Sequence, residues 1–194
     1  MQMKTSYVLP IKGVGSADLP LVGGKGANLG ELVRAGLPVP EAFCVTTDAY
    51  RGFITAAGLQ EPILSALAGC NYDDMGDLGA RAQRIRDLIA AAAMPDDVAQ
   101  AIRQGYAALE KALGAGVDVS VRSSATAEDL PGTSFAGQQD TYLHVRGIEA
   151  VLEHVQRCWG SLWTDRAISY RYRQGFAHED VLLAVVVQEM FPSE

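Results

Sequence analysis

The sequence predicts an α+β fold, and three kinds of pattern support that prediction. Apolar residues recur at helical spacing in four segments, β-branched and aromatic residues fill three short runs, and glycines gather in two clusters. The 194 residues are 48% hydrophobic and 20% charged. That composition supplies the core of one large domain or of two small lobes.

The first element is a glycine-rich turn that leads into a helix. Residues 22–32 read VGGKGANLGEL, and Leu29, Leu32 and the following Val33 form the expected buried side of the helix. Glycines let backbone N–H groups approach an oxyanion closely, and Lys25 adds a formal positive charge, so the segment suits a phosphate group. Its spacing is neither that of a P-loop nor GxGxxG. A glycine-rich turn with a solvated lysine is therefore an equal alternative.

Three further helices are predicted from apolar spacing. The pattern over roughly residues 76–114 predicts a helical hairpin, and a later helix follows over 148–162. Core packing accounts for the apolar face of that later helix. The residues that define the three helices are Leu78, Ala82, Ile85 and Ile89, then Val98, Ile102, Tyr106, Leu109 and Leu113, then Ile148, Val151, Leu152, Val155, Trp159 and Leu162.

Three runs are expected as strands, at residues 117–122, 141–145 and 182–188. Between the first two runs lie roughly 17 small, hydroxylated and glycine residues. A loop of that length is uncommon within a compact domain and often has a function. Arg122 stands at its root and could donate a fork of hydrogen bonds to a phosphate that the loop covers. A surface Ω-loop is the alternative. The hydroxyl groups that the phosphate interpretation uses are those of Ser123, Ser124, Thr126, Thr133 and Ser134.

Residues 125–137 of this loop are small and bury little apolar area. We therefore expect them to be mobile when no phosphate is bound, because ligation is what offsets the entropy of ordering them.

Charge and cysteine content exclude several classes of function. Sixteen Lys and Arg against 23 Asp and Glu give a formal charge of -7, which argues against nucleic acid and anionic membranes as partners. Cys44, Cys70 and Cys158 are far apart and set among apolar or small residues, so we expect reduced thiols with no disulfide and no zinc site. The amino terminus has no apolar signal region, and no apolar run approaches the ~20 residues of a membrane span. The expected location is cytoplasmic.

Four longer strings together resemble one enzyme family. They are VGGKGANLGEL, GLPVPEAFCVTTDAY, VSVRSSATAEDLPGTSFAGQQDTYL and SLWTDRAISYRYRQGFAHEDV. They resemble the amino-terminal nucleotide-binding region of the phosphoenolpyruvate synthase and pyruvate phosphate dikinase family, which includes rifampin phosphotransferase. The resemblance runs from about Val22 to Met190, and RSSATAEDLP followed by SFAGQ is its most specific part.

The resemblance implies a partial ATP-grasp domain, in which residues 1–194 form the first lobe, with the helical hairpin inside it, and the start of the second lobe. Lys25 and Arg122 then match family residues that reach the ATP phosphates, and we expect them to converge on one cleft. Gly137 and Thr141 match the phosphate-covering loop and its exit. Gln188 matches the glutamine of the strand that leads into the adenine pocket.

The resemblance further implies Mg²⁺, held by acidic positions beyond Glu194, so that no catalytic residue and no metal ligand is assigned within this chain. The implied partners are ATP and the remaining domains of a full-length enzyme, namely a phosphohistidine domain and a second-substrate domain. The expected function is that of an ATP-binding fragment of a phosphotransferase that passes phosphate through a histidine to pyruvate, inactive alone. Rifampin as acceptor is one alternative. A non-catalytic nucleotide-binding or regulatory module is another.

Overall fold

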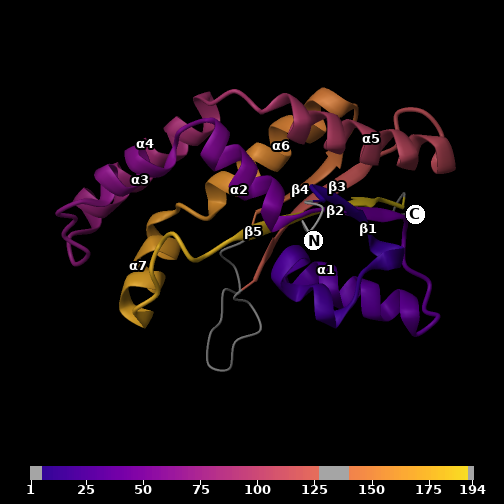
Figure 1. The fold of residues 1–194 in the computed structure, drawn as a ribbon, viewed down its shortest axis with the longest axis horizontal. Coiled ribbons are helices and arrows are strands. Elements are labelled where there is room, and N and C mark those ends of the chain that lie inside the picture. Colours follow the sequence, from indigo (N-terminus) through magenta and orange to yellow (C-terminus); the bar gives the residue numbers. More distant parts are fainter. Residues whose placement is uncertain (1–5, 127–139, 192–194) are drawn as a thin grey trace, which may run out of the picture.

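A five-stranded antiparallel sheet organises the chain in the computed structural model, which describes residues 6–126 and 140–191. The strands lie in the order β1-β2-β5-β3-β4, so the last strand in sequence is central in space. Helix α1 covers one face, helices α2, α5 and α6 cover the other, and α4 packs on α6 (Figure 1). The strands are β1 (Val8–Pro10), β2 (Ala42–Val45), β3 (Val119–Ala125), β4 (Thr141–Val145) and β5 (Leu183–Glu189).

Seven α-helices and two short 3₁₀ turns complete the described part of the chain. They are η1 (Ile11–Gly13), η2 (Ser16–Asp18), α1 (Leu19–Arg34), α2 (Thr47–Ala56), α3 (Gln60–Leu67), α4 (Met75–Ala91), α5 (Asp96–Leu113), α6 (Ile148–Ser161) and α7 (Asp165–Gln174). The mixed α+β class is confirmed, and β3, β4 and β5 correspond to the three predicted runs. None of the helices described is long and apolar enough to cross a membrane.

Helices α4 and α5 occupy the two segments of the predicted helical hairpin, Met75–Ala91 and Asp96–Leu113. Helix α4 packs principally on α6, whereas α5 packs on both β1 and α6 (Figure 1). Gln156 of α6 donates to the carbonyl oxygens of Ile89 and Ala92 at the end of α4, and Glu149 of α6 pairs with Arg103 of α5. The apolar face of α6 is broad enough to receive both helices, so α6 is the centre of this layer.

The main core lies between the sheet and the helices on its α6 side. Trp159 of α6 is fully buried and stacks on Phe53 of α2 with 4.9 Å between the ring centroids. Val185 and Val187 of β5 point into the same cluster. Because side chains alternate along a strand, Ala184 and Val186 point to the opposite face, where they pack with residues of α1.

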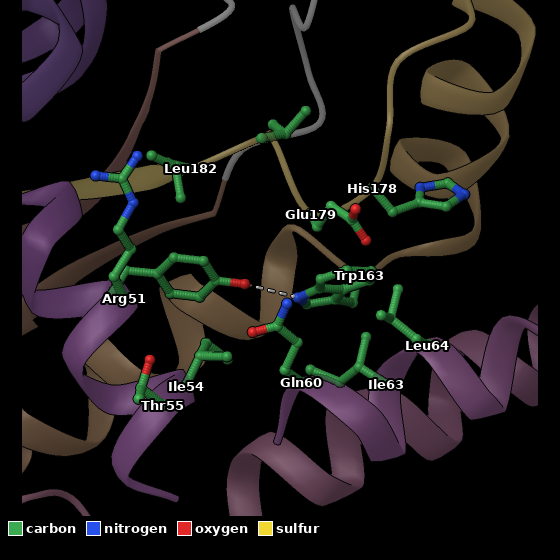
Figure 2. Close-up of a pocket in the computed structure, with 12 residues that line it drawn as sticks. Arg51, Ile54, Thr55, Gln60, Ile63, Leu64, Trp163, His178, Glu179 and Leu182 are labelled. Atoms are coloured by element: carbon green, nitrogen blue, oxygen red, sulfur yellow. Dashed lines mark hydrogen bonds between the residues drawn. The ribbon is translucent and has the colours of Figure 1, made fainter. Parts of the chain in front are cut away.

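A cavity of about 240 Å³ opens at one end of the helical layer (Figure 2). It lies between α2, α3 and the residues before β5. Trp163 forms part of its wall and donates from Nε1 to the Tyr50 hydroxyl at 3.1 Å, and burial raises the pKa of Tyr50 to about 12. His178 borders the cavity, but its ring points away from the centre.

Arg171 of α7 is fully buried, and no carboxylate among the described residues pairs with it. Its Nη1 donates to the Leu162 carbonyl oxygen at 2.7 Å, at the partially negative carboxyl end of α6, and its guanidinium lies 4.9 Å from the Trp163 ring centroid. Its Nε donates to His178 Nδ1 at 3.1 Å. Since arginine can only donate, His178 carries its proton on Nε2, facing the Tyr72 hydroxyl at 3.3 Å.

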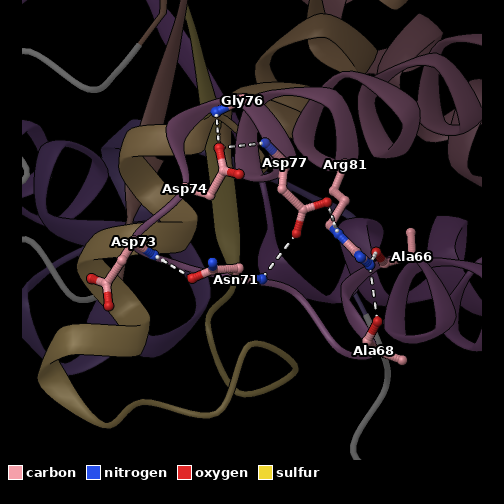
Figure 3. Close-up of polar contacts among 8 residues, drawn as sticks. All are labelled: Ala66, Ala68, Asn71, Asp73, Asp74, Gly76, Asp77 and Arg81. Carbon is pink, nitrogen blue, oxygen red and sulfur yellow. Dashed lines mark hydrogen bonds and ion pairs between the residues drawn. The ribbon is translucent and has the colours of Figure 1, made fainter.

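A second polar network joins the end of α3 to the start of α4 (Figure 3). Asp74 caps α4 by accepting from the backbone N–H groups of Gly76 and Asp77. Asp77 accepts from the Asn71 backbone N–H and pairs with Arg81, and these bonds hold the pKa of Asp77 below its usual value. Arg81 in turn donates to the final carbonyl groups around α3, at Ala66 and Ala68.

The partly buried His178 predicts a pH dependence of stability. Burial, together with the Arg171 charge, lowers the pKa of His178 from 6.5 to about 4. Between those values the unfolded chain binds a proton that the folded chain does not, so the free energy of unfolding should fall as pH drops from 6.5 to about 4. His178→Asn cannot titrate, so its urea-unfolding free energy should show a flatter slope over that window. Equal slopes in the wild-type and His178→Asn proteins would contradict this assignment.

Candidate functional site

The glycine-rich segment is a break within α1 and not a turn before it. The backbone leaves helical geometry at Gly23 alone, with φ 68° and ψ 176°, a region open essentially to glycine. Lys25 therefore lies in the first turn of the helix that restarts after the break, half-buried. A Cβ at position 23 would stand 2.3 Å from the Ser124 carbonyl oxygen, so the break is also a point of close contact with β3.

Ser124 of β3 joins the two sides of this break. Its hydroxyl donates to the Val22 carbonyl oxygen at 2.8 Å and accepts from the Gly26 backbone N–H at 3.3 Å. A restarted helix leaves its first N–H groups without intrahelical partners, and Ser124 takes one of them. The hydroxyl predicted to cover a phosphate thus holds α1 on the sheet. Ser123 also binds within the fold, because its hydroxyl donates to the Asp140 carbonyl oxygen at 3.3 Å.

Small residues form most of the fully buried side of α1, which corrects in part the expectation of a leucine face. Gly26, Ala27 and Gly30 are buried, and Leu29 and Val33 pack partly buried against the same cluster, whereas Leu32 is 41% exposed. A Cβ at Gly30 would meet the Val14 carbonyl oxygen at 2.3 Å. The glycines that suggested a phosphate cradle therefore also serve to bring α1 close to its neighbours.

Strand register places Arg122 and Thr141 on the face of the sheet that α1 covers. Arg122 lies opposite Val186 of β5 on one side and opposite Thr141 of β4 on the other. Directly paired residues of antiparallel strands share a face, and Val186 packs in the α1-side cluster with Val22. Arg122 is half-buried and Thr141 is exposed, so both remain open to a ligand.

Gln188 belongs to the same face, two residues after Val186 on β5. It pairs with Ser120 of β3 and Ala42 of β2, and its side chain is largely buried. At the strand rise it stands about 7 Å along β5 from the level of Arg122. A ligand lying along this face would meet Arg122 and Gln188 in succession.

The charges of Lys25 and Asp140 act in opposite directions on the buried Cys158 thiol of α6. Burial raises the pKa of the Cys158 thiol, the charge of Asp140 raises it further, and the charge of Lys25 lowers it. Asp140 directly precedes Thr141 at the start of β4. Gly137 and most of residues 125–137 lie outside the described residues. Ala125 itself is the buried last residue of β3.

The cavity of Figure 2 is separate from this face, since its lining contains none of Lys25, Arg122, Thr141 and Gln188. Within residues 6–126 and 140–191, no group of three or more His, Cys, Asp and Glu side chains could hold a metal ion. Cys44, Cys70 and Cys158 are free thiols.

A comparison with models of protein families assigns the sequence around these residues to a family. The model of the pyruvate phosphate dikinase AMP/ATP-binding domain matches residues 19–194. The chain belongs to this family. The matched AMP/ATP-binding domain includes the α1 break, the strands that carry Arg122, Thr141 and Gln188, and α7.

Curated relatives carry this domain within much longer proteins. A probable phosphoenolpyruvate synthase of Methanocaldococcus jannaschii is 52% identical over 91% of this chain, which covers 15% of that protein. One from Archaeoglobus fulgidus is 52% identical over 96% of the chain, or 25% of that protein. The phosphoenolpyruvate synthase of Synechocystis is 44% identical over 98% of the chain, or 24% of that protein. The chain thus spans a quarter or less of the length of these relatives.

The break in α1 predicts different costs for two similar glycine substitutions. Gly23 and Gly36 both have φ near 70°, but a Cβ at Gly36 meets nothing within 4 Å. Gly36→Ala should therefore lower the free energy of unfolding by only about 1–2 kcal/mol, the cost of the left-handed backbone. Gly23→Ala adds overlap with Ser124 and should cost about 2 kcal/mol more. Urea unfolding measures both, and equal losses would mean that the α1–β3 contact is looser than described.

Proposed function

We propose that this chain is the ATP-binding part of a phosphotransferase of the phosphoenolpyruvate synthase type, and that ATP lies along the sheet face beside α1. One observation carries the proposal. Ser124 fixes the break of α1 on β3, which brings the segment of Lys25 to the face that carries Arg122. Within the family resemblance this face corresponds to the first lobe of an ATP-grasp fold, with ATP held between it and a second lobe.

The residues divide the nucleotide between them. Lys25 and Arg122 attract the triphosphate, Arg122 through a forked set of donors and Lys25 as a point charge. Gly137 and Thr141 belong to the loop and strand start that cover the phosphates. Gln188, farther along β5, reaches toward the base. Lysine, arginine and backbone donors disperse the charge that develops during phosphoryl transfer, so this half of the site needs no acid–base pair.

Magnesium is implied by the family but does not fit the residues described. When bound, Mg²⁺ would neutralise part of the charge of the ATP phosphates. The absence of a carboxylate cluster in residues 6–126 and 140–191 leads us to assign it no ligand in this part of the chain. The later steps, through a histidine to pyruvate, belong to other parts of a longer protein. Pyruvate is preferred to rifampin because the matched relatives named above are phosphoenolpyruvate synthases.

Two substitutions test the phosphate-binding roles. Lys25→Ala and Arg122→Ala should each weaken ATP binding by about ten- to a hundredfold, the usual worth of a hydrogen bond to a charged group. Arg122→Lys keeps the charge but loses the fork, so it should lie between wild type and Arg122→Ala. Arg103→Ala removes a surface arginine paired with Glu149 on the opposite side of the sheet and serves as control. Calorimetric titration with ATP measures the affinity of all four variants. Unchanged affinity in both Lys25→Ala and Arg122→Ala would show that ATP does not bind on this face.

The isolated 194-residue chain should show no pyruvate-dependent or rifampin-dependent ATP consumption. It lacks an assigned metal ligand and an acceptor held in line with the terminal phosphate, and positioning supplies most of the rate in phosphoryl transfer. Turnover by this chain, abolished in Arg122→Ala, would show that the site is complete without further domains. If a longer protein that contains this chain binds ATP but has no phosphotransferase activity, that result would favour a regulatory module.

A further inference from the structure

Three strand ends meet beyond Gln188, and Asp118 connects them. The Asp118 carbonyl oxygen accepts from the Met190 backbone N–H at 2.9 Å, just past the end of β5. Its carboxylate Oδ2 accepts from His144 Nδ1 of β4 at 3.0 Å and from Arg146 Nη2 at 3.2 Å. These bonds, that of His144 above all, lower the pKa of Asp118. Asp118 thus ties the ends of β4 and β5 to the start of β3.

His144 adopts a backbone conformation that a strand does not require. Its φ is 57°, and among residues 6–126 and 140–191 it is the one non-glycine residue with a positive φ. This conformation costs free energy for a residue with a Cβ. It turns the His144 backbone N–H toward Met190 Sδ, at 3.2 Å. The register of β3 against β4 also shifts between Val119 and Val121, directly beside this point.

Met190 is consequently held twice. Its backbone N–H is bound to Asp118, and its thioether sulfur is bound to the N–H of a strained His144 that Asp118 also holds. The His144 side chain is 70% exposed and the Asp118 side chain 19% exposed, and a contact made by so exposed a side chain contributes little to stability. The bond of His144 to Asp118 is therefore a weak reason to keep a strained backbone. Strain of this kind collects at functional sites, where a fixed geometry is needed.

We propose that Asp118 and His144 are positioning residues for the base side of the nucleotide site. They act through Met190, fixing the end of β5 so that Gln188 meets the base at one distance and angle, and they do not touch the nucleotide. The inference rests on the proposed function. It adds that selection for a base-bearing nucleotide, as distinct from affinity for a triphosphate, depends on this clamp of Asp118, His144 and Met190.

The test compares ATP with inorganic tripolyphosphate, which carries the phosphate charge but no base. Asp118→Asn removes the negative charge of the carboxylate to which the side chains of His144 and Arg146 bind. His144→Gly removes the ring yet relieves the positive-φ strain, so it should fold at least as stably as wild type. Each variant should bind ATP about tenfold more weakly than wild type and bind tripolyphosphate unchanged. Glu149→Gln, which alters another arginine-paired surface carboxylate, should change neither affinity.

The outcomes separate the clamp from the site. Wild-type chain that binds neither probe would overturn the proposed function along with the clamp. Wild-type chain that binds both probes equally would overturn the clamp alone, because no selection for the base then exists for it to support. Wild-type chain that prefers ATP, with variants that keep this preference, would overturn the clamp alone and leave Asp118 and His144 with a structural role. If the stable His144→Gly variant lost affinity for ATP and for tripolyphosphate alike, the clamp would also be overturned. Such a loss would mean that the substitution disturbs the whole sheet face beside α1 and not the base side alone.

Discussion

The hydroxyl of Ser124 is the contact on which the rest of the candidate site depends. It bonds to the carbonyl oxygen of Val22 before the break in α1 and to the N–H of Gly26 after it, so one side chain of β3 fixes both halves of the helix. Gly23 makes this possible, since any other residue there would overlap the Ser124 backbone. The position of Lys25 relative to the sheet follows from this junction.

The two faces of the sheet are packed in different ways, and the difference suits a binding domain. Large side chains such as Trp159 and Phe53 interlock on the helical side, where α6 holds α4 and α5. On the other side α1 approaches through small residues and packs principally over β5 and β3. Arg122 and the edge strand β4 are therefore left partly open beside a helix whose restarted end carries Lys25. A rigid helical layer thus supports a face that can receive a ligand.

Local patterns in the sequence predicted the class of fold and the three strands β3, β4 and β5. They failed where long-range contacts decide the outcome. No periodicity indicates that α4 packs on α6 in preference to α5, or that the Ser124 hydroxyl is used to hold α1. The exposure of Leu32 follows from close approach at Gly30, which depends on Val14. The contact of His144 with Asp118 joins residues that spacing alone does not relate.

The central claim is that Lys25 and Arg122 serve one triphosphate on the face beside α1. A crystal structure of the chain with a non-hydrolysable ATP analogue measures this most directly. The account predicts phosphate oxygens within hydrogen-bond distance of both the Lys25 Nζ and the Arg122 guanidinium, with the base beside Gln188. Phosphates bound away from α1, or the analogue seated in the cavity between α2 and α3, would contradict it.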